Sequence, residues 1–118
     1  MDDRAYDFWL SLSFWSEDTF GLDIHRGPIG PLKHLQKEVE EALKTPDDLE
    51  EYADLLFLVF DSTRRAGFGY HELMDACREK LKKNKKRLWP KPSLNDEPIE
   101  HIRDEDKYKF IKKDGNEE

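Results

Sequence analysis

Two short acidic segments contain the residues of this chain that are best suited to catalysis or metal binding. Glu38 and Glu41 form the first pair, and Glu51 and Asp54 form the second; each pair is three residues apart. In a helix such residues share one face, with their Cβ atoms about 5–6 Å apart. Carboxylates that close repel one another unless a positive charge lies between them. Four of them on neighbouring helices predict a site for Mg²⁺ or Mn²⁺, which prefer oxygen ligands.

Solvation of these acids on exposed helix faces is the simplest alternative, because glutamate is rarely buried. Glu40 and Glu50 fit that description. Asp54 differs, since it directly precedes the apolar run 55–60, and we expect its side chain to lie near the core. A buried acid needs a partner. Residues 45–63 contain no Lys or Arg that could supply one locally, so a metal ion is a good candidate.

A helical hairpin is predicted to bring the two acidic pairs together. Apolar residues recur at helical spacing over about 31–44, and a second helix is expected to run to about residue 66. Thr45 is the predicted N-cap of the second helix, with Pro46 in its first turn. The very short connection makes the two helices antiparallel neighbours, so the acidic pairs lie level with each other.

The remaining pattern is also helical. We expect helices over 4–15 and about 70–88, a Gly- and Pro-containing loop over 16–31, and a mostly polar segment over 93–118 whose last dozen residues are disordered or loosely attached. No segment alternates convincingly as a strand would. The predicted fold class is therefore all-α, a bundle of about four helices.

Composition limits the possible partners. The 118 residues indicate one domain, and 36% hydrophobic against 40% charged content suggests that oligomerisation completes the core. A net charge of −7 argues against general nucleic-acid binding. There is no apolar run of transmembrane length, no disulfide partner for Cys77 and no basic signal-peptide region. These features predict a cytoplasmic protein without a membrane partner.

A local basic segment spans residues 78–91 of this acidic chain. Lys80, Asn84 and Arg87 lie at i, i+4 and i+7, which places them on one helix face, and Lys83 is a further candidate. These residues are suited to binding the phosphates and sugar of an anionic ligand. The alternative is a solvated basic helix end.

Three other side chains are candidate substrate contacts. Trp15 could stack on a base, although aromatic residues near an N-terminus more often belong to the core. His34, one turn before Glu38, is interpreted as a polar edge residue or substrate contact rather than a metal ligand. Asp61 extends the face of Asp54 by two turns. Instead of contacting a substrate, Asp61 could form an ion pair with Arg64, Arg65 or Lys80.

Other chemistries lack their motifs. No histidine has a glutamate three residues before it, which argues against a di-iron helical site. There is no nucleophilic Ser or Cys motif, and no glycine-rich phosphate loop.

The acidic pairs resemble those of the all-α nucleoside triphosphate pyrophosphohydrolases of the MazG type. The segments 30–38, 61–67 and 80–90 are similar to the phage and bacterial MazG-like subfamily, which includes the phage MazZ-type dATP/dGTP diphosphohydrolases. The resemblance covers roughly residues 14–103. It implies a MazG-like domain over 1–103, followed by a charged tail over 104–118.

The resemblance also implies an activity. Members hydrolyse a (deoxy)nucleoside triphosphate, here most simply dGTP or dATP, to the monophosphate and pyrophosphate. They bind Mg²⁺ or Mn²⁺ through the four acids and form dimers or tetramers. Two alternatives stay open: removal of a pyrimidine or damaged nucleotide at the same site, and a non-catalytic helical dimerisation module.

Overall fold

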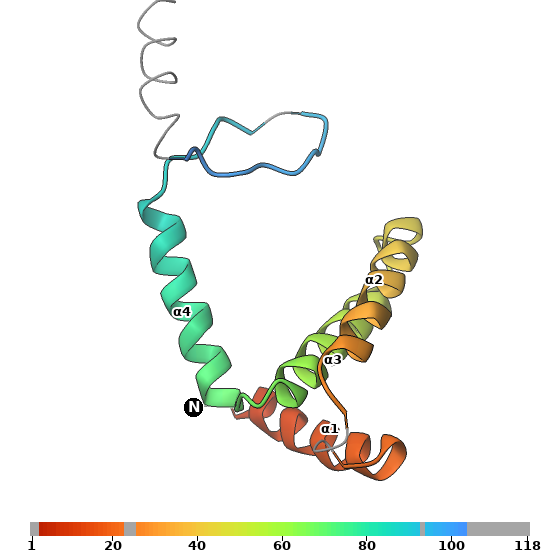
Figure 1. Cartoon of the computed structure of the whole chain (residues 1–118). Coiled ribbons are helices and arrows are strands. Elements are labelled where there is room, and N and C mark those ends of the chain that lie inside the picture. Colours follow the sequence, from red (N-terminus) through yellow and green to blue (C-terminus); the bar gives the residue numbers. More distant parts are fainter. Residues whose placement is uncertain (1–2, 23–25, 93, 104–118) are drawn as a thin grey trace, which may run out of the picture. The chain divides into compact units, whose positions relative to one another are not determined.

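The computed structural model describes residues 3–22, 26–92 and 94–103, and within them it contains four helices and no strand. In chain order these are α1 (Arg4–Phe20), α2 (Ile29–Lys44), α3 (Leu49–Arg65) and α4 (Tyr70–Lys86) (Figure 1). The predicted all-α class is confirmed. Among the described residues, no helix is long and apolar enough to cross a membrane. The predicted tail, 104–118, lies outside the described residues.

The chain divides into two compact units, residues 1–75 and 76–118. The first unit holds α1, α2, α3 and the first turns of α4. The second holds the rest of α4 and the segment that follows it. The two units are described separately below.

Helix α1 is longer than the sequence pattern predicts. It continues through Phe20, so the expected loop over 16–31 is wrong for its first five positions, and it is also wrong for 29–31, where α2 has already begun. Gly21 ends the helix with a positive φ of 99°, and its N–H donates to the carbonyl of Glu17 at 3.0 Å. The additional turn is held by tertiary contacts, because Ser16 is fully buried and the ring of Trp15 is in edge contact with Phe57 of α3.

Helices α2 and α3 pack against each other as the predicted hairpin. The predicted cap is wrong: α3 begins at Leu49, and Asp48 accepts a hydrogen bond from the backbone N–H of Glu50 at 3.0 Å. Thr45 instead donates to the carbonyl of Glu41, in the last turn of α2. Asp is as good an N-cap as Thr. Asp48 caps α3 because the hydroxyl of Thr45 is already hydrogen-bonded to α2.

The core of the first unit lies where α1 crosses α3. Trp9 and Leu12 of α1 meet Phe60 of α3, with the Trp9 and Phe60 ring centroids 5.0 Å apart. Tyr70, Leu73 and Met74 of α4 pack against this cluster. The apolar run of α3 is not buried on all sides, because Leu56 remains exposed.

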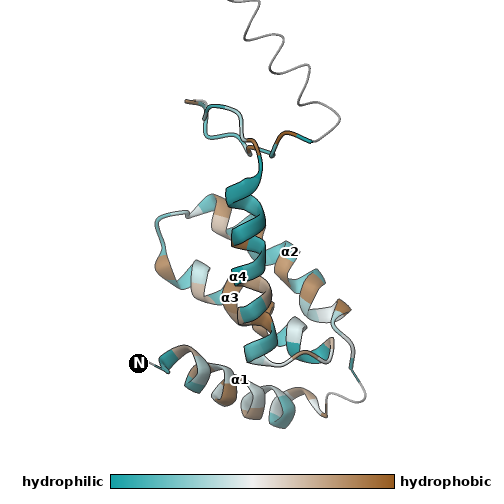
Figure 2. Cartoon of the chain, turned by 90° about the vertical axis from the view of Figure 1, so that its left-hand side faces the viewer, coloured by the Kyte–Doolittle hydropathy of each residue, from teal (hydrophilic) through white to brown (hydrophobic). Residues whose placement is uncertain are grey.

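The second unit begins within α4, which is largely hydrophilic (Figure 2). The helix ends at Lys86, two residues before the predicted end, and Cys77 and Leu81 are exposed on it. The indole N–H of Trp89 donates to the carbonyl of Asn84 at 2.7 Å. Beyond it, Leu88 and Ile102 form an isolated antiparallel bridge.

Candidate functional site

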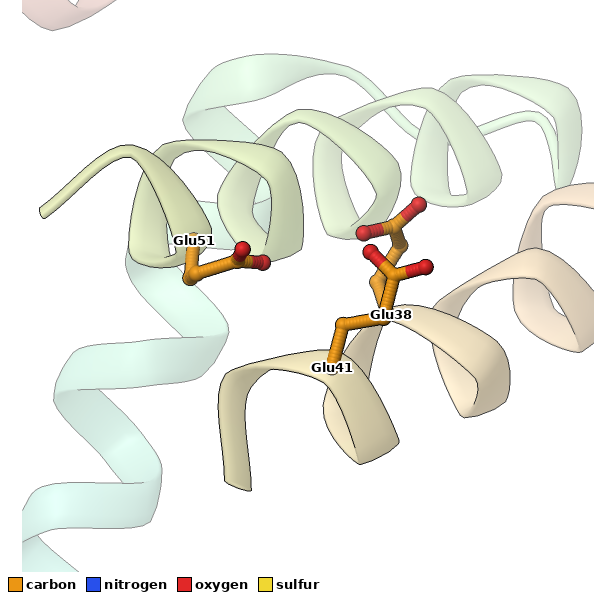
Figure 3. A group of neighbouring side chains, drawn as sticks. All are labelled: Glu38, Glu41 and Glu51. Carbon is orange, nitrogen blue, oxygen red and sulfur yellow. The ribbon is translucent and has the colours of Figure 1, made fainter. Parts of the chain in front are cut away.

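Three of the four predicted acids come together between α2 and α3. Glu38 and Glu41 project from α2 and Glu51 from α3, as Figure 3 shows, and one carboxylate oxygen from each lies within 4.8 Å of the others. The hairpin produces this arrangement. Its short connection sets the last turns of α2 beside the first turns of α3.

Two oxygens of this cluster are buried without a partner. Oε2 of Glu38 and Oε2 of Glu51 are shielded from solvent and accept no hydrogen bond from any residue that the structure describes. Buried polar atoms are nearly always hydrogen-bonded, so such oxygens call for a ligand. The donor set consists of carboxylate oxygens, which suits Mg²⁺ or Mn²⁺. The residues therefore fit the implied metal.

The electrostatics of Glu51 agree with this interpretation. Burial, followed by the nearby charges of Glu41, Asp48, Asp54 and Glu38, raises the pKa of the Glu51 carboxyl. Each of these effects disfavours the ionised form. A divalent cation at the cluster would act in the opposite direction and favour ionisation.

Asp54 lies differently from the expectation. Its side chain is exposed rather than directed toward the core, and it is not part of the three-glutamate cluster. The apolar run that follows it did not draw it inward, because in a helix adjacent residues face different directions. Asp54 nevertheless lines a pocket together with Glu38. Its role as a metal ligand stays a prediction.

His34 is attached to the acidic cluster. Its Nε2 lies 3.1 Å from Oε1 of Glu38, one turn along α2. The imidazole therefore contacts Oε1 of Glu38, whereas Oε2 is the oxygen without a partner among the described residues. This contact helps to orient the Glu38 carboxylate.

A pocket of about 380 Å³ adjoins the cluster through Glu38. That volume lies within the range of about 300–1,000 Å³ typical of small-molecule sites. Trp15, Phe20 and Phe57 supply aromatic walls, and the predicted contacts Trp15, His34 and Asp61 all line it. Trp15 meets Phe20 and Phe57 edge to face, with centroids 5.4 and 5.3 Å away, and keeps about half of its surface exposed.

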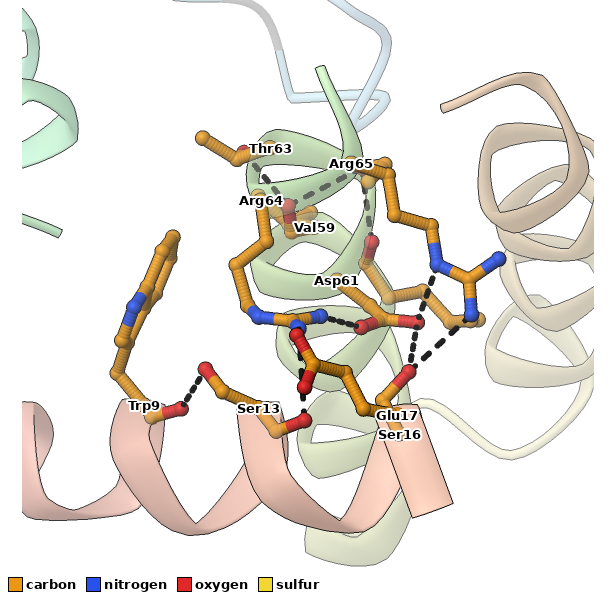
Figure 4. A network of polar contacts seen from close by, with 11 residues as sticks. Trp9, Ser13, Ser16, Glu17, Val59, Asp61, Thr63, Arg64 and Arg65 are labelled. Atoms are coloured by element: carbon orange, nitrogen blue, oxygen red, sulfur yellow. Dashed lines mark hydrogen bonds and ion pairs between the residues drawn. The ribbon is translucent and has the colours of Figure 1, made fainter. Parts of the chain in front are cut away.

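Asp61 is held by a network of buried polar contacts, drawn in Figure 4. Its carboxylate pairs with Arg64 and with Nε of Arg65, the latter at 3.4 Å. Ser16 donates to Oδ2 of Asp61 at 3.1 Å and accepts from Nη2 of Arg65 at 3.2 Å. Of the pairing partners expected for Asp61, the two arginines of α3 are the ones observed. We call Ser16, Asp61, Arg64 and Arg65 the Asp61 network.

Ser16 was missed by sequence reasoning. The sequence pattern places it in the expected loop over 16–31, and a lone serine carries no signal of burial. The helical spacing of Leu12 and Ser16 places them on one face, which could have suggested that Ser16 faces α3.

The predicted phosphate-binding residues belong to the second unit. Lys80 and Lys83 are exposed, whereas Asn84 and Arg87 are half-buried. Nη1 of Arg87 donates to Oδ1 of Asn84 at 3.0 Å. Arg87 lies just beyond the end of α4, so it is not on the predicted helix face, but this contact holds its side chain against Asn84 in the last turn of the helix. Their role toward a ligand stays a prediction.

Comparison with known proteins gives two matches. Residues 11–108 match the family described as dATP/dGTP pyrophosphohydrolase. Over 91 residues the chain is 47% identical to the Eaa protein of Salmonella phage P22, an alignment that covers 77% of this chain and 27% of the phage protein. The chain thus spans about a quarter of the length of that relative. No solved structure matches.

Proposed function

We propose that this chain, which belongs to the dATP/dGTP pyrophosphohydrolase family, hydrolyses dGTP or dATP to the monophosphate and pyrophosphate with Mg²⁺ or Mn²⁺. One observation carries the proposal: three glutamates converge beside a pocket, and two of their oxygens are buried without a partner among the described residues. A triphosphate needs such a site, because its negative oxygens must be neutralised before water can attack.

The carboxylates have distinct tasks in this proposal. Glu38, Glu41, Glu51 and Asp54 hold the cation, which when bound neutralises phosphate oxygens and lowers the pKa of a water. Glu38 or Glu41 accepts the proton that this water loses. His34 keeps Glu38 oriented through their 3.1 Å contact.

The basic residues of α4, together with Arg87 just after its end, bind the polyphosphate and sugar. Lys80 and Lys83 contribute exposed ammonium groups, and Arg87 contributes a guanidinium that Asn84 orients. Arg is suited to bidentate contact with phosphate, whereas Lys acts as a point charge. The base occupies the aromatic pocket beside Trp15, which Asp61 also lines.

Biological context is also part of the proposal. The relative comes from a phage, which supports a role in shaping the deoxynucleotide pool of an infected cell, in the host cytoplasm. We further propose a dimer or tetramer, because large apolar side chains remain exposed on α2 and α3, among them Leu43, Leu49 and Leu56. Neither a stable nucleic-acid partner nor a membrane partner is part of the proposal.

The decisive experiment is a panel of canonical deoxynucleoside and ribonucleoside triphosphates with Mg²⁺ or Mn²⁺. Products are identified as monophosphate plus pyrophosphate or as diphosphate plus phosphate. Release of pyrophosphate from dGTP or dATP is expected. Preference for a pyrimidine or damaged nucleotide would indicate the house-cleaning alternative, and no turnover with either metal would favour a non-catalytic helical module.

A further inference from the structure

We infer that Trp89 is a positioning residue, which holds the guanidinium of Arg87 in the orientation that contacts the triphosphate. The inference rests on the proposed function and goes further by assigning a task to the segment that follows α4. All the residues concerned belong to the second unit, 76–118. In Figure 1 the chain leaves the end of α4 and returns beside it.

Arg87 needs support from its neighbours because it lies outside the helix, which ends at Lys86. An arginine side chain has many rotamers, and the freedom that it loses on binding weakens its contact with a phosphate. Two contacts restrain Arg87. Its backbone N–H donates to the carbonyl of Asn84 at 3.3 Å, and its Nη1 donates to Oδ1 of Asn84 at 3.0 Å. The orientation of Arg87 therefore depends on how firmly Asn84 is held.

The indole of Trp89 gives the same carbonyl a second donor. Its N–H donates to the Asn84 carbonyl at 2.7 Å, which is the shorter of the two hydrogen bonds to that oxygen. A carbonyl oxygen has two lone pairs, and the last four carbonyls of a helix lack donors within the helix. The indole bond joins position 84 to position 89 and so closes the turn that contains Arg87.

The segment that returns to the end of α4 restrains Trp89. The carbonyl of Leu88 accepts a hydrogen bond from the N–H of Ile102 at 2.6 Å, and these two residues form an antiparallel bridge. The ring of His101 lies 5.9 Å from that of Trp89, at an angle of 69°. Edge contacts of this kind favour one relative orientation of the two rings. We call Leu88, Trp89, His101 and Ile102 the clasp.

The clasp leaves one edge of the Arg87 guanidinium available. Among the described residues, Nη1 is used by Asn84, whereas Nε and Nη2 donate to no acceptor. These two groups point to the same side of the planar guanidinium and suit a bidentate contact with a phosphate. Arg87 is only half-buried, so a ligand can reach it. Because the guanidinium is already oriented, less freedom is lost on binding and the affinity is higher.

The first test is Trp89→Phe, which removes the indole N–H and keeps an aromatic ring. We expect KM for dGTP to rise about fivefold, as for one lost hydrogen bond, while kcat changes by less than about twofold. Leu94→Ala is the matched control, because Leu94 is fully exposed in the same segment. Circular dichroism and the melting temperature show whether each variant folds. A wild-type KM in folded Trp89→Phe would overturn the inference.

A double-mutant cycle distinguishes positioning from direct contact with the substrate. If Trp89 acts through Arg87, Trp89→Phe should add no further increase in KM to that of Arg87→Ala. In a Lys80→Ala background, Trp89→Phe should still raise KM about fivefold. The same increase in both backgrounds would mean that Trp89 acts independently of Arg87, and the positioning role would be wrong.

The contribution of the returning segment is tested by His101→Ala, which removes the ring contact with Trp89. This variant should raise KM about two- to threefold, and the increase should likewise vanish in the Arg87→Ala background. Glu100→Ala is its control, because Glu100 is an exposed neighbour. If His101→Ala and Glu100→Ala both keep the wild-type KM, the returning segment does not hold Trp89.

Binding of inorganic pyrophosphate separates failure of this inference from failure of the proposed function. Calorimetric titration in the presence of Mg²⁺ needs no turnover, and Trp89→Phe should weaken the affinity for pyrophosphate about fivefold. If the wild-type protein hydrolyses no triphosphate but shows this difference, the hydrolase is wrong and the clasp stands. Wild-type turnover with equal pyrophosphate affinity in the two proteins leaves the hydrolase intact and refutes the clasp. So does a wild-type protein that binds no pyrophosphate.

Discussion

The hydroxyl of Ser16 donates a hydrogen bond to Oδ2 of Asp61 at 3.1 Å, across 45 positions of the sequence. This contact joins the end of α1 to α3 and holds Asp61, which lines the pocket. It also shows that α1 helps to build the site, because Trp15 and Phe20 on the same helix form part of its aromatic wall.

Removing that hydroxyl should destabilise the fold. Ser16→Ala leaves Asp61 and Arg65 each without one buried hydrogen-bond partner, at a cost of about 1–3 kcal/mol. Urea unfolding at neutral pH measures the loss. Ser11→Ala is the matched control, since Ser11 is exposed on the same helix. If both variants unfold at the same urea concentration, the Ser16 contact contributes nothing to stability.

Divalent ions should stabilise the folded chain. A ligand that binds only the folded form at ten times its dissociation constant adds about 1.4 kcal/mol, which raises the melting temperature by several degrees. Glu41→Gln should abolish both this gain and metal-dependent pyrophosphate release, with its helix content intact. Glu40→Gln removes an exposed acid beside the cluster and should behave like wild type. Near-normal turnover by Glu41→Gln would refute the metal assignment.

Metal affinity should depend on pH through Glu51. Because its folded-state pKa is raised, the metal-free protein gains stability as the pH falls from neutral toward that pKa, and loses this contribution as the pH rises through it. Metal binding requires the ionised carboxyl, so the apparent affinity for Mn²⁺ should weaken over the same fall in pH.

Calorimetric Mn²⁺ titrations at several pH values between about 5 and 8 measure this effect, a window set by the direction of the Glu51 pKa shift. Glu51→Gln should flatten the pH dependence as well as weaken binding. Glu50→Gln should keep it, because Glu50 is exposed and outside the cluster. An unaltered slope in Glu51→Gln would mean that another group titrates.

The aromatic wall should govern substrate affinity. Trp15→Ala removes a half-exposed ring from the pocket and should raise KM by about fivefold or more, since stacking on one ring contributes about 1–3 kcal/mol. Phe14→Ala is the control, because Phe14 is more exposed than Trp15 and does not line the pocket. Steady-state kinetics with dGTP and dATP measure both. If Trp15→Ala leaves both KM and the base preference unchanged, Trp15 packs against its neighbours and does not contact the substrate.

Arg87 should bind the triphosphate. Loss of a charge-assisted phosphate contact costs about 1.5–3 kcal/mol, so Arg87→Ala should raise KM by about tenfold or more. Lys86→Ala removes a neighbouring positive charge that lies outside the predicted binding face and should have little effect. Equal KM values for the two variants would mean that Arg87 is a solvated residue of the basic segment and does not bind the triphosphate.

The acidic hairpin could be predicted because its determinants are local. Spacing of three residues places Glu38 beside Glu41, and a short connection brings Glu51 level with them. The all-α class followed in the same way from helical periodicity.

Features that depend on contacts between helices could not be predicted from the sequence. Thr45 and Asp48 are both good N-caps, and the sequence does not say that Thr45 bonds back to α2. The last turn of α1 exists because Ser16 is buried against Asp61. Asp54 shows that an acid next to an apolar run need not point inward.

Anomalous scattering from a manganese-soaked crystal tests the central claim most directly. The account predicts a manganese peak bonded to carboxylate oxygens of Glu38, Glu41 and Glu51, with the orphaned Oε2 atoms of Glu38 and Glu51 among its ligands. Well-ordered glutamates with no anomalous peak among them would contradict it.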